Sequence, residues 1–178
     1  MPVVCPSWFS FILYNPVRKA FTDRSKVLDE SCITRESIVL EIGAGNGFFT
    51  EAISERAKKV IAVELQQGMV RKLKKRVQKF GDAVEIVQED IASADLPHAM
   101  ADVCLLYYSF HEIARQEEAA ATIAGTVKQG GVLSIYEPSI EVNSKDMAAT
   151  VSLFQSLGFS LEATRDTMFT RFARMKKE

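Results

Sequence analysis

The chain has 178 residues, a length that suits one domain, since domains usually hold roughly 100–200 residues. Hydrophobic residues make up 47% and charged residues 25%, which is typical of a folded globular protein and excludes an intrinsically disordered chain. The 22 Lys and Arg nearly balance 23 Asp and Glu, and the net charge of −1 gives no overall attraction to nucleic acid or anionic lipid.

Cysteine and histidine are too few and too scattered to indicate a disulfide or metal site. Cys5, Cys32 and Cys104 are odd in number and form neither a disulfide framework nor the spacing of a zinc site. With two histidines in the whole chain, we predict no metal. Because no apolar stretch approaches the roughly 20 residues that cross a bilayer, and no signal peptide is evident, we expect a cytoplasmic protein without a membrane span.

Short apolar runs alternate along the chain with longer segments of helical periodicity. After an amphipathic helix over about 16–31, the pattern predicts strands at 37–42, 59–64, 83–88, 101–108, 132–136, 159–163 and 168–174. It predicts helices at 48–58, 66–80, 113–128 and 143–157, three of them ended by glycine, at Gly81, Gly130-Gly131 and Gly158.

This alternation predicts an α/β fold with a mostly parallel sheet, because each crossover helix covers one face of the sheet. No repeat or linker interrupts the chain, so we expect a single domain over residues 1–178. Residues 1–36 stand apart as an N-terminal helical segment whose aromatic start could form a lid or pack in the core. Residues 37–178 form the expected cofactor-binding core.

The turn after the first core strand is rich in glycine. Gly43, Gly45 and Gly47 stand between a strand and a helix, where glycine permits a tight turn and lets a ligand lie against bare backbone. Glu64 ends the next strand, where a carboxylate can accept both hydroxyls of a ribose. We interpret the pair as a nucleotide-binding turn; the structural alternatives are a plain tight connection and a solvated strand end.

The spacing of the glycines argues against a dinucleotide. The pattern is G-x-G-x-G rather than G-x-G-x-x-G, and Glu41 lies two residues before the first glycine. A carboxylate there would repel a pyrophosphate, whereas it would attract a cationic amine by about 1–4 kcal/mol. A ligand with a ribose at one end and an ammonium and a sulfonium at the other fits these residues better than NAD, so an NAD-dependent oxidoreductase is a weaker alternative.

Several motifs resemble, in order, those of the class I S-adenosylmethionine-dependent methyltransferases. The likeness covers the chain from about residue 37 to its end and is carried by Val39–Gly47, Val60–Glu64, Gln88–Asp90, His111–Ile113 and Gly130–Pro138. The resemblance implies a three-layer α/β/α sandwich with a Rossmann-like, seven-stranded, mostly parallel sheet whose last strand is antiparallel. It implies S-adenosyl-L-methionine as cofactor and S-adenosyl-L-homocysteine as product.

The resemblance also implies roles for individual residues. Glu41 would hold the methionine amine, Glu64 the ribose and Asp90 the adenine amino group; the alternative for Asp90 is a helix or turn cap. The residues implied to bind the cofactor are Glu41, Gly43, Ala44, Gly45, Gly47, Glu64, Leu65, Asp90, Ile91, Tyr107 and Tyr108.

The segment after the fourth core strand contains two acid–base candidates. His111 and Glu112 lie where ligands collect in such sheets and could activate a methyl acceptor, or they could cap the next helix. Glu137, at the end of the fifth strand, faces a possible acceptor pocket, with a turn residue as its alternative.

The acceptor is expected to be a small molecule. The chain is nearly neutral, has no appended RNA-binding domain, and carries Tyr107-Tyr-Ser-Phe110 where amino-methylating nucleic-acid enzymes have an Asn-Pro-Pro-Tyr motif. The basic run along 71–79 is typical of a solvated helix face. The alternatives are an RNA or protein methyltransferase, and a non-catalytic module or partner subunit that binds S-adenosylmethionine without turnover.

Overall fold

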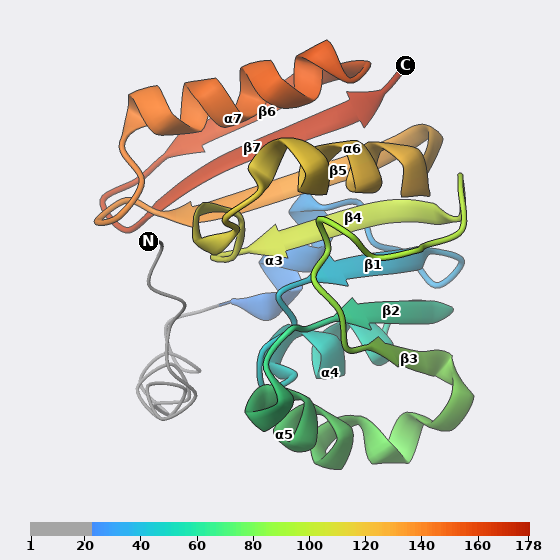
Figure 1. Ribbon diagram of the computed structural model, residues 1–178. Helices are drawn as coiled ribbons and strands as arrows, with labels where there is room; N and C mark the ends of the chain where they lie inside the picture. Colours follow the sequence, from blue (N-terminus) through green and yellow to red (C-terminus); the bar gives the residue numbers. More distant parts are fainter. Residues whose placement is uncertain (1–22) are drawn as a thin grey trace.

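The computed structural model describes residues 23–178 (Figure 1). One seven-stranded sheet runs through the molecule in the order β3-β2-β1-β4-β5-β7-β6. Its strands are β1 (Ile38–Ile42), β2 (Lys59–Val63), β3 (Val84–Val87), β4 (Ala101–Tyr107), β5 (Val127–Pro138), β6 (Phe159–Asp166) and β7 (Thr170–Lys177). Only β7 is antiparallel to its neighbours, β5 and β6, which confirms the predicted mostly parallel sheet with an antiparallel last strand.

Helices cover both faces of the sheet, as the unbroken apolar strands require. They are α3 (Arg24–Glu30), α4 (Phe48–Ser54), α5 (Gln67–Val77), α6 (Gln116–Thr126) and α7 (Ser144–Ser156), with 3₁₀-helices η1 (Gln78–Ala83) and η2 (Phe110–Glu112). Figure 1 shows α6 and α7 together on one side of the sheet and α4 and α5 near its β3 end.

The core follows the two-residue period of the strands. On β1, Leu40 and Ile42 pack in a cluster with buried residues of α6 and α7, while Val39 packs in a second cluster with those of α3, α4 and α5. Cys104, in the middle of β4, is fully buried among the first cluster. The three-layer α/β/α sandwich is therefore confirmed.

Several predicted boundaries were wrong. The helix predicted at 113–128 begins at Gln116, after η2, and ends at Thr126, because Val127 pairs with Ala101 and starts β5. Gly130 and Gly131 lie within β5 rather than at a helix end. The helix predicted at 48–58 ends at Ser54, and the one predicted at 66–80 ends at Val77 and continues as η1 across Gly81.

The tail strands also differ from the prediction. The strand predicted at 168–174 starts at Thr170 and runs to Lys177, and Met168 and Phe169 belong to the β6–β7 turn. The lid predicted in residues 1–36, and the first part of the helix predicted at 16–31, fall largely outside the described residues; α3 is the part the structure describes. No helix within 23–178 is long and apolar enough to span a membrane.

Candidate functional site

A cleft of about 950 Å³ opens at the carboxyl ends of the parallel strands. The crossover after β1 leads to α4 on one face and that after β4 leads to α6 on the other, so the chain reverses its winding between these two strands. Ligands of open α/β sheets bind outside such a switch point. All eleven residues predicted to bind the cofactor except Gly47, and both predicted catalytic residues, line this cleft.

The glycine loop lies at the base of the cleft, with all three glycines at positive φ. The N–H groups of Gly43 and Ala44 donate to the Val63 carbonyl at 2.9 and 3.1 Å, which ties the loop to β2. A Cβ on Gly43 would lie 2.6 Å from the Ser109 Cβ, whereas one on Gly45 would meet only the Gly43 carbonyl oxygen, at 3.9 Å. Gly43 is thus required by packing, while the space beside Gly45 is open to a ligand.

Gly47 lies outside the cleft lining and has a different reason to be glycine. It precedes α4 with a φ of 84°, and a Cβ there would approach the Leu73 Cδ1 to 2.8 Å. The residue therefore allows α4 and α5 to pack closely. The prediction that Gly47 faces the cofactor finds no support in this geometry.

Glu41 is a buried carboxylate at the base of the cleft. Burial raises its pKa to about 8, a hydrogen bond at 2.6 Å from the Thr50 hydroxyl opposes that rise, and the charge of Glu64 adds to it. Such a group is ionised most readily when a cation binds beside it. Its chemistry therefore fits the ammonium of a methionine moiety.

Glu64 lies just beyond β2 and is almost fully buried. One carboxylate oxygen accepts from the Gly45 N–H at 2.8 Å and the other from the Gln66 N–H at 2.7 Å. Burial raises the pKa of Glu64, and these backbone donors counteract the rise. The carboxylate is held rigidly next to the open side of Gly45, as a ribose-binding group requires.

Asp90 caps a turn, one of the two interpretations left open by the sequence, and its contact with the adenine stays a prediction. Its carboxylate caps the following turn through the Ala92 N–H at 2.9 Å and also pairs with Arg115 at 2.9 Å. The Arg115 hydrogen bond holds the pKa of Asp90 below its usual value. Ile91 is buried and Leu65 is 55% exposed at the same end of the cleft, an apolar lining suited to a flat base.

An aromatic wall stands at the ends of β4 and β5. The Tyr107 ring stacks on Tyr108 at 4.4 Å between centroids and tilts against Phe49 at 4.2 Å and Tyr136 at 5.4 Å. Tyr108 has a φ of 57°, and its hydroxyl contacts the Thr170 hydroxyl on β7. Electron-rich rings beside a sulfonium favour its positive charge.

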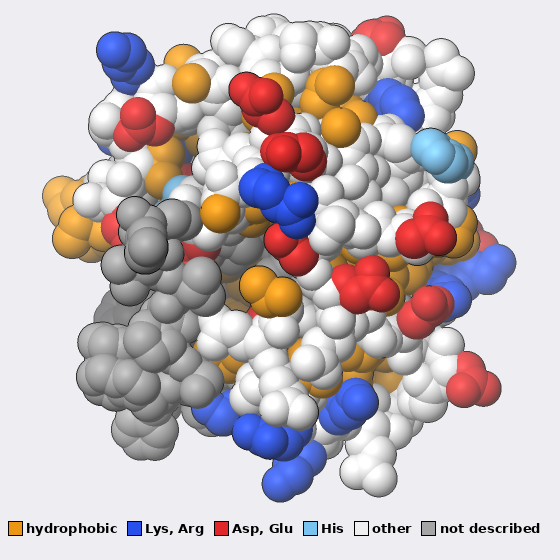
Figure 2. Space-filling view, viewed as in Figure 1, with side chains coloured by type: hydrophobic (Ala, Val, Ile, Leu, Met, Phe, Trp, Pro, Cys, Tyr) orange, Lys and Arg blue, Asp and Glu red, His pale blue; other side chains and the backbone are white. Residues whose placement is uncertain are grey.

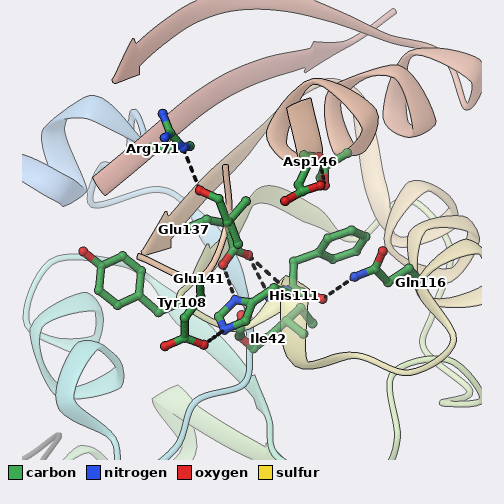
Figure 3. A network of polar contacts seen from close by, with 12 residues as sticks. Ile42, Tyr108, His111, Gln116, Glu137, Glu141, Asp146 and Arg171 are labelled. Carbon is green, nitrogen blue, oxygen red and sulfur yellow. Dashed lines mark hydrogen bonds and ion pairs between the residues drawn. The ribbon is translucent and has the colours of Figure 1, made fainter. Parts of the chain in front are cut away.

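His111 is placed between two carboxylates (Figure 3). Its Nδ1 contacts Glu137, and its Nε2 lies 3.0 Å from a carboxylate oxygen of Glu141. Burial alone would lower the pKa of His111, but the hydrogen bond to Glu137 and the negative charges nearby outweigh it, so the pKa is raised. Burial raises the pKa of the adjacent Glu112.

Sequence reasoning missed Glu141 and the far wall of the cleft. On that wall Glu30, the last residue of α3, pairs with Arg165 of β6 and accepts a hydrogen bond at 3.0 Å from the Tyr136 hydroxyl. No motif connects these residues. The sequence could have indicated Tyr136 and Glu141 by their positions, because both flank the carboxyl end of a predicted strand, where such a sheet binds ligands. Among residues 23–178, no group of His, Cys, Asp and Glu forms a metal-binding cluster.

The sequence matches a family described as "Methyltransferase domain" over residues 40–135. An uncharacterized methyltransferase of Geobacillus sp. (strain WCH70) is 31% identical over 115 residues, covering 64% of this chain and 53% of that protein. A mitochondrial ribosomal RNA small subunit methyltransferase of Arabidopsis thaliana is 42% identical over 74 residues, covering 40% of this chain and 20% of that protein. The chain thus spans about half or less of these relatives.

Solved structures share the fold at low sequence identity. A SAM-dependent methyltransferase from Aquifex aeolicus superposes with a TM-score of 0.86 at 20% identity, covering 98% of this chain and 100% of that one. The N-methyltransferase NodS from Bradyrhizobium japonicum WM9, in complex with S-adenosyl-L-homocysteine, superposes with a TM-score of 0.73 at 13% identity. The match covers 86% of this chain and 85% of that one. The cleft's buried Glu41, clamped Glu64 and open Gly45 fit the same cofactor. The chain belongs to the methyltransferase-domain family, the class I S-adenosylmethionine-dependent methyltransferases.

Proposed function

We propose that this methyltransferase acts on a small acceptor that carries no negative charge. The observation that carries the proposal is the charge of the cleft, in which acidic side chains outnumber Lys26 and Arg165. The acidic residues that line it are Asp23, Glu30, Glu41, Glu64, Glu89, Asp90, Glu112 and Glu141. Arg165 is itself paired with Glu30. A phosphate backbone or an anionic metabolite would be repelled from such a cleft.

The basic residues lie elsewhere. The exposed lysines and arginines of α5 project from the outer face of that helix, because its apolar side, which includes Leu73 and Val77, packs on the sheet. Figure 2 shows Lys and Arg side chains gathered along the lower edge of the molecule, in the region of α5. Their placement supports the interpretation of a solvated helix face rather than a path that guides RNA into the cleft.

S-adenosylmethionine, when bound, supplies an electrophilic methyl group on a positively charged sulfur. Glu41 and Glu64 would fix its two ends, and the Tyr107–Tyr108 wall would exclude water from the reacting centre. Positioning of this kind can contribute about 7–11 kcal/mol to catalysis. Glu112 and His111, both at the cleft surface, would receive the proton that an O–H or N–H acceptor releases.

The acceptor proposal is tested with methyl-labelled S-adenosylmethionine offered together with a small-molecule cell extract or with total RNA from the same cells. We expect label to enter the small-molecule fraction, in compounds that are neutral or cationic. Label entering RNA would overturn the proposal and favour the activity named for the Arabidopsis relative. No transfer in either arm, with the cofactor bound, would overturn it in favour of a non-catalytic binding module.

Binding of the cofactor is measured separately by calorimetry with S-adenosylhomocysteine. Gly45→Val should weaken binding by at least about tenfold, because the added side chain fills the ligand's space. Gly130→Val is the matched control, since Gly130 also has a positive φ with open space around its Cβ but lies outside the cleft lining. NADH should not compete, and tight NADH binding would restore the oxidoreductase alternative.

A further inference from the structure

We propose that Glu137 is a positioning residue that fixes the His111 imidazole by Nδ1 and leaves Nε2 as the atom that meets the acceptor. The inference deepens the proposed function and rests on it. Glu137 is 1% exposed and does not line the cleft, whereas His111 and Glu141 do. Glu137 therefore acts on an acceptor only through the histidine.

A single carboxylate holds both the backbone and the ring of His111. One oxygen of Glu137 accepts the N–H groups of Phe110, at 2.9 Å, and His111, at 3.3 Å. The other oxygen contacts the His111 Nδ1. Since Glu137 lies in β5 next to its last residue and the η2 backbone donates to it, the ring has a fixed anchor on the sheet. Figure 3 shows the carboxylate between the η2 backbone and the imidazole.

The two carboxylates that flank the ring differ in how easily they can be replaced. Glu141 lies 3.0 Å from Nε2, but its side chain is 59% exposed, against 2% for Glu137. Water and a ligand can compete for an exposed carboxylate, whereas removing a buried one leaves unsatisfied donors. An acceptor group can therefore displace Glu141 from Nε2 without disturbing the Glu137 anchor.

This asymmetry defines a proton path. When the acceptor is an alcohol or amine, its O–H or N–H proton passes to a neutral Nε2 as the bond from O or N to the methyl carbon forms. The electron pair of the breaking carbon–sulfur bond stays on sulfur. The product is an imidazolium whose positive charge faces the Glu137 carboxylate, so Glu137 favours the state that accepts the proton.

The carboxylates around the ring favour the imidazolium that this step produces. Glu112 on η2, Glu137 on β5 and Glu141 after β5 all raise the pKa of His111. Arg171 of β7, which pairs with Glu137 of β5 in the sheet, donates to the Val142 carbonyl and to Asp166. Asp146 on α7 caps its own helix through the Asn143 N–H. Thus Arg171 forms its ion pair with Asp166 and not with Glu137.

The test uses the two histidines of the chain as probe and reference in an NMR titration of the imidazole resonances, with no acceptor required. Glu137→Gln should make His111 protonate at least about tenfold more weakly, because a neutral amide replaces the paired carboxylate. Glu141→Gln should produce a smaller change, and the His98 resonances serve as the reference in both variants. Equal titration of His111 in wild type and E137Q, or a larger effect of E141Q, would overturn the inference.

A measurement on the wild-type protein guards against loss of folding in E137Q. The nitrogen-15 shifts of neutral His111 report which ring nitrogen carries the proton. We expect the proton on Nδ1; a proton on Nε2 would overturn the inference. Calorimetry with S-adenosylhomocysteine distinguishes failure of this inference from failure of the proposed function. A normal affinity with the wrong tautomer refutes only the role of Glu137, whereas absent binding refutes the proposed function.

Discussion

The cofactor half of the cleft, around β1 and β2, is built differently from the acceptor half at the ends of β4 and β5. Glu41 and Thr50 are 9 residues apart, and Gly45 and Glu64 are 19 apart. Across the cleft, Tyr108 meets Thr170 over 62 residues, and Glu30 meets Arg165 over 135. The first half is a local backbone arrangement that a motif can encode, whereas the second exists only once distant segments of the chain have packed together.

Gly43→Ala should break the cofactor half most severely. The new Cβ would clash with the Ser109 Cβ at a position of positive φ, and we expect a loss of about 2–4 kcal/mol in unfolding free energy together with cofactor binding. Denaturant unfolding measures the first and calorimetry the second. Gly130→Ala, with equal backbone strain but open space, should lose only about 1 kcal/mol; equal losses would contradict the packing argument.

Glu41→Gln should weaken S-adenosylmethionine binding by about 10–100-fold, through loss of a buried charge partner. In the free protein the pKa of about 8 lies above the ordinary 4.5. The folded state therefore retains a proton that the unfolded state loses, and stability falls as pH rises between these values.

Two measurements check the role of Glu41. The variant should lose this fall in stability, seen in denaturant unfolding at a series of pH values. Wild type should release a proton on binding the cofactor near neutral pH, seen as buffer-dependent calorimetric heat, and the variant should not. Proton release that persists in Glu41→Gln would assign it to another group.

Arg165→Gln tests the acceptor half through the contact that joins α3 to β6. We expect the unfolding free energy to fall by about 1 kcal/mol, because the Arg165–Glu30 pair is partly exposed and the Tyr136 hydroxyl still donates to Glu30. The hydrogen bond from Arg165 holds the pKa of Glu30 below its ordinary 4.5. The difference in unfolding free energy between wild type and variant should thus reach its full size above pH 4.5. It should vanish as the pH falls through the lowered pKa of Glu30. A loss that persists in acid would contradict the ion-pair explanation.

Arg115→Ala should have the smallest effect. Arg115 is exposed and Asp90 is partly exposed, so we expect no measurable change in Tm and a change of less than about threefold in cofactor affinity, measured by calorimetry. Asp90→Ala, which also removes the turn cap, should have the larger effect. The reverse order would mean that Arg115 itself contacts the cofactor.

The sequence predicted the glycine turn after β1 and the carboxylate after β2 because each follows a strand that apolar periodicity identifies. The strands before and after Gly43 and Glu64, their order and the acidic end of β2 all follow from apolar periodicity and turn residues. The wrong boundaries cluster where strand pairing overrode helical pattern, as at Val127, which pairs with Ala101 instead of extending α6. Gly47 was assigned to the ligand because a motif does not distinguish a glycine that faces a cleft from one that faces a helix.

The sequence by itself determined the α/β class and the places of the glycine turn and of Glu64, since these depend on periodicities and on residues near one another in the chain, while the antiparallel last strand followed from the family resemblance. Tertiary structure alone decided that Glu137 anchors His111, that Glu141 lies at its other nitrogen and that Arg165 pairs with Glu30. The physical reason is that a carboxylate acquires a partner, and its pKa changes, only through burial and contact, and both arise when the far ends of the sheet come together.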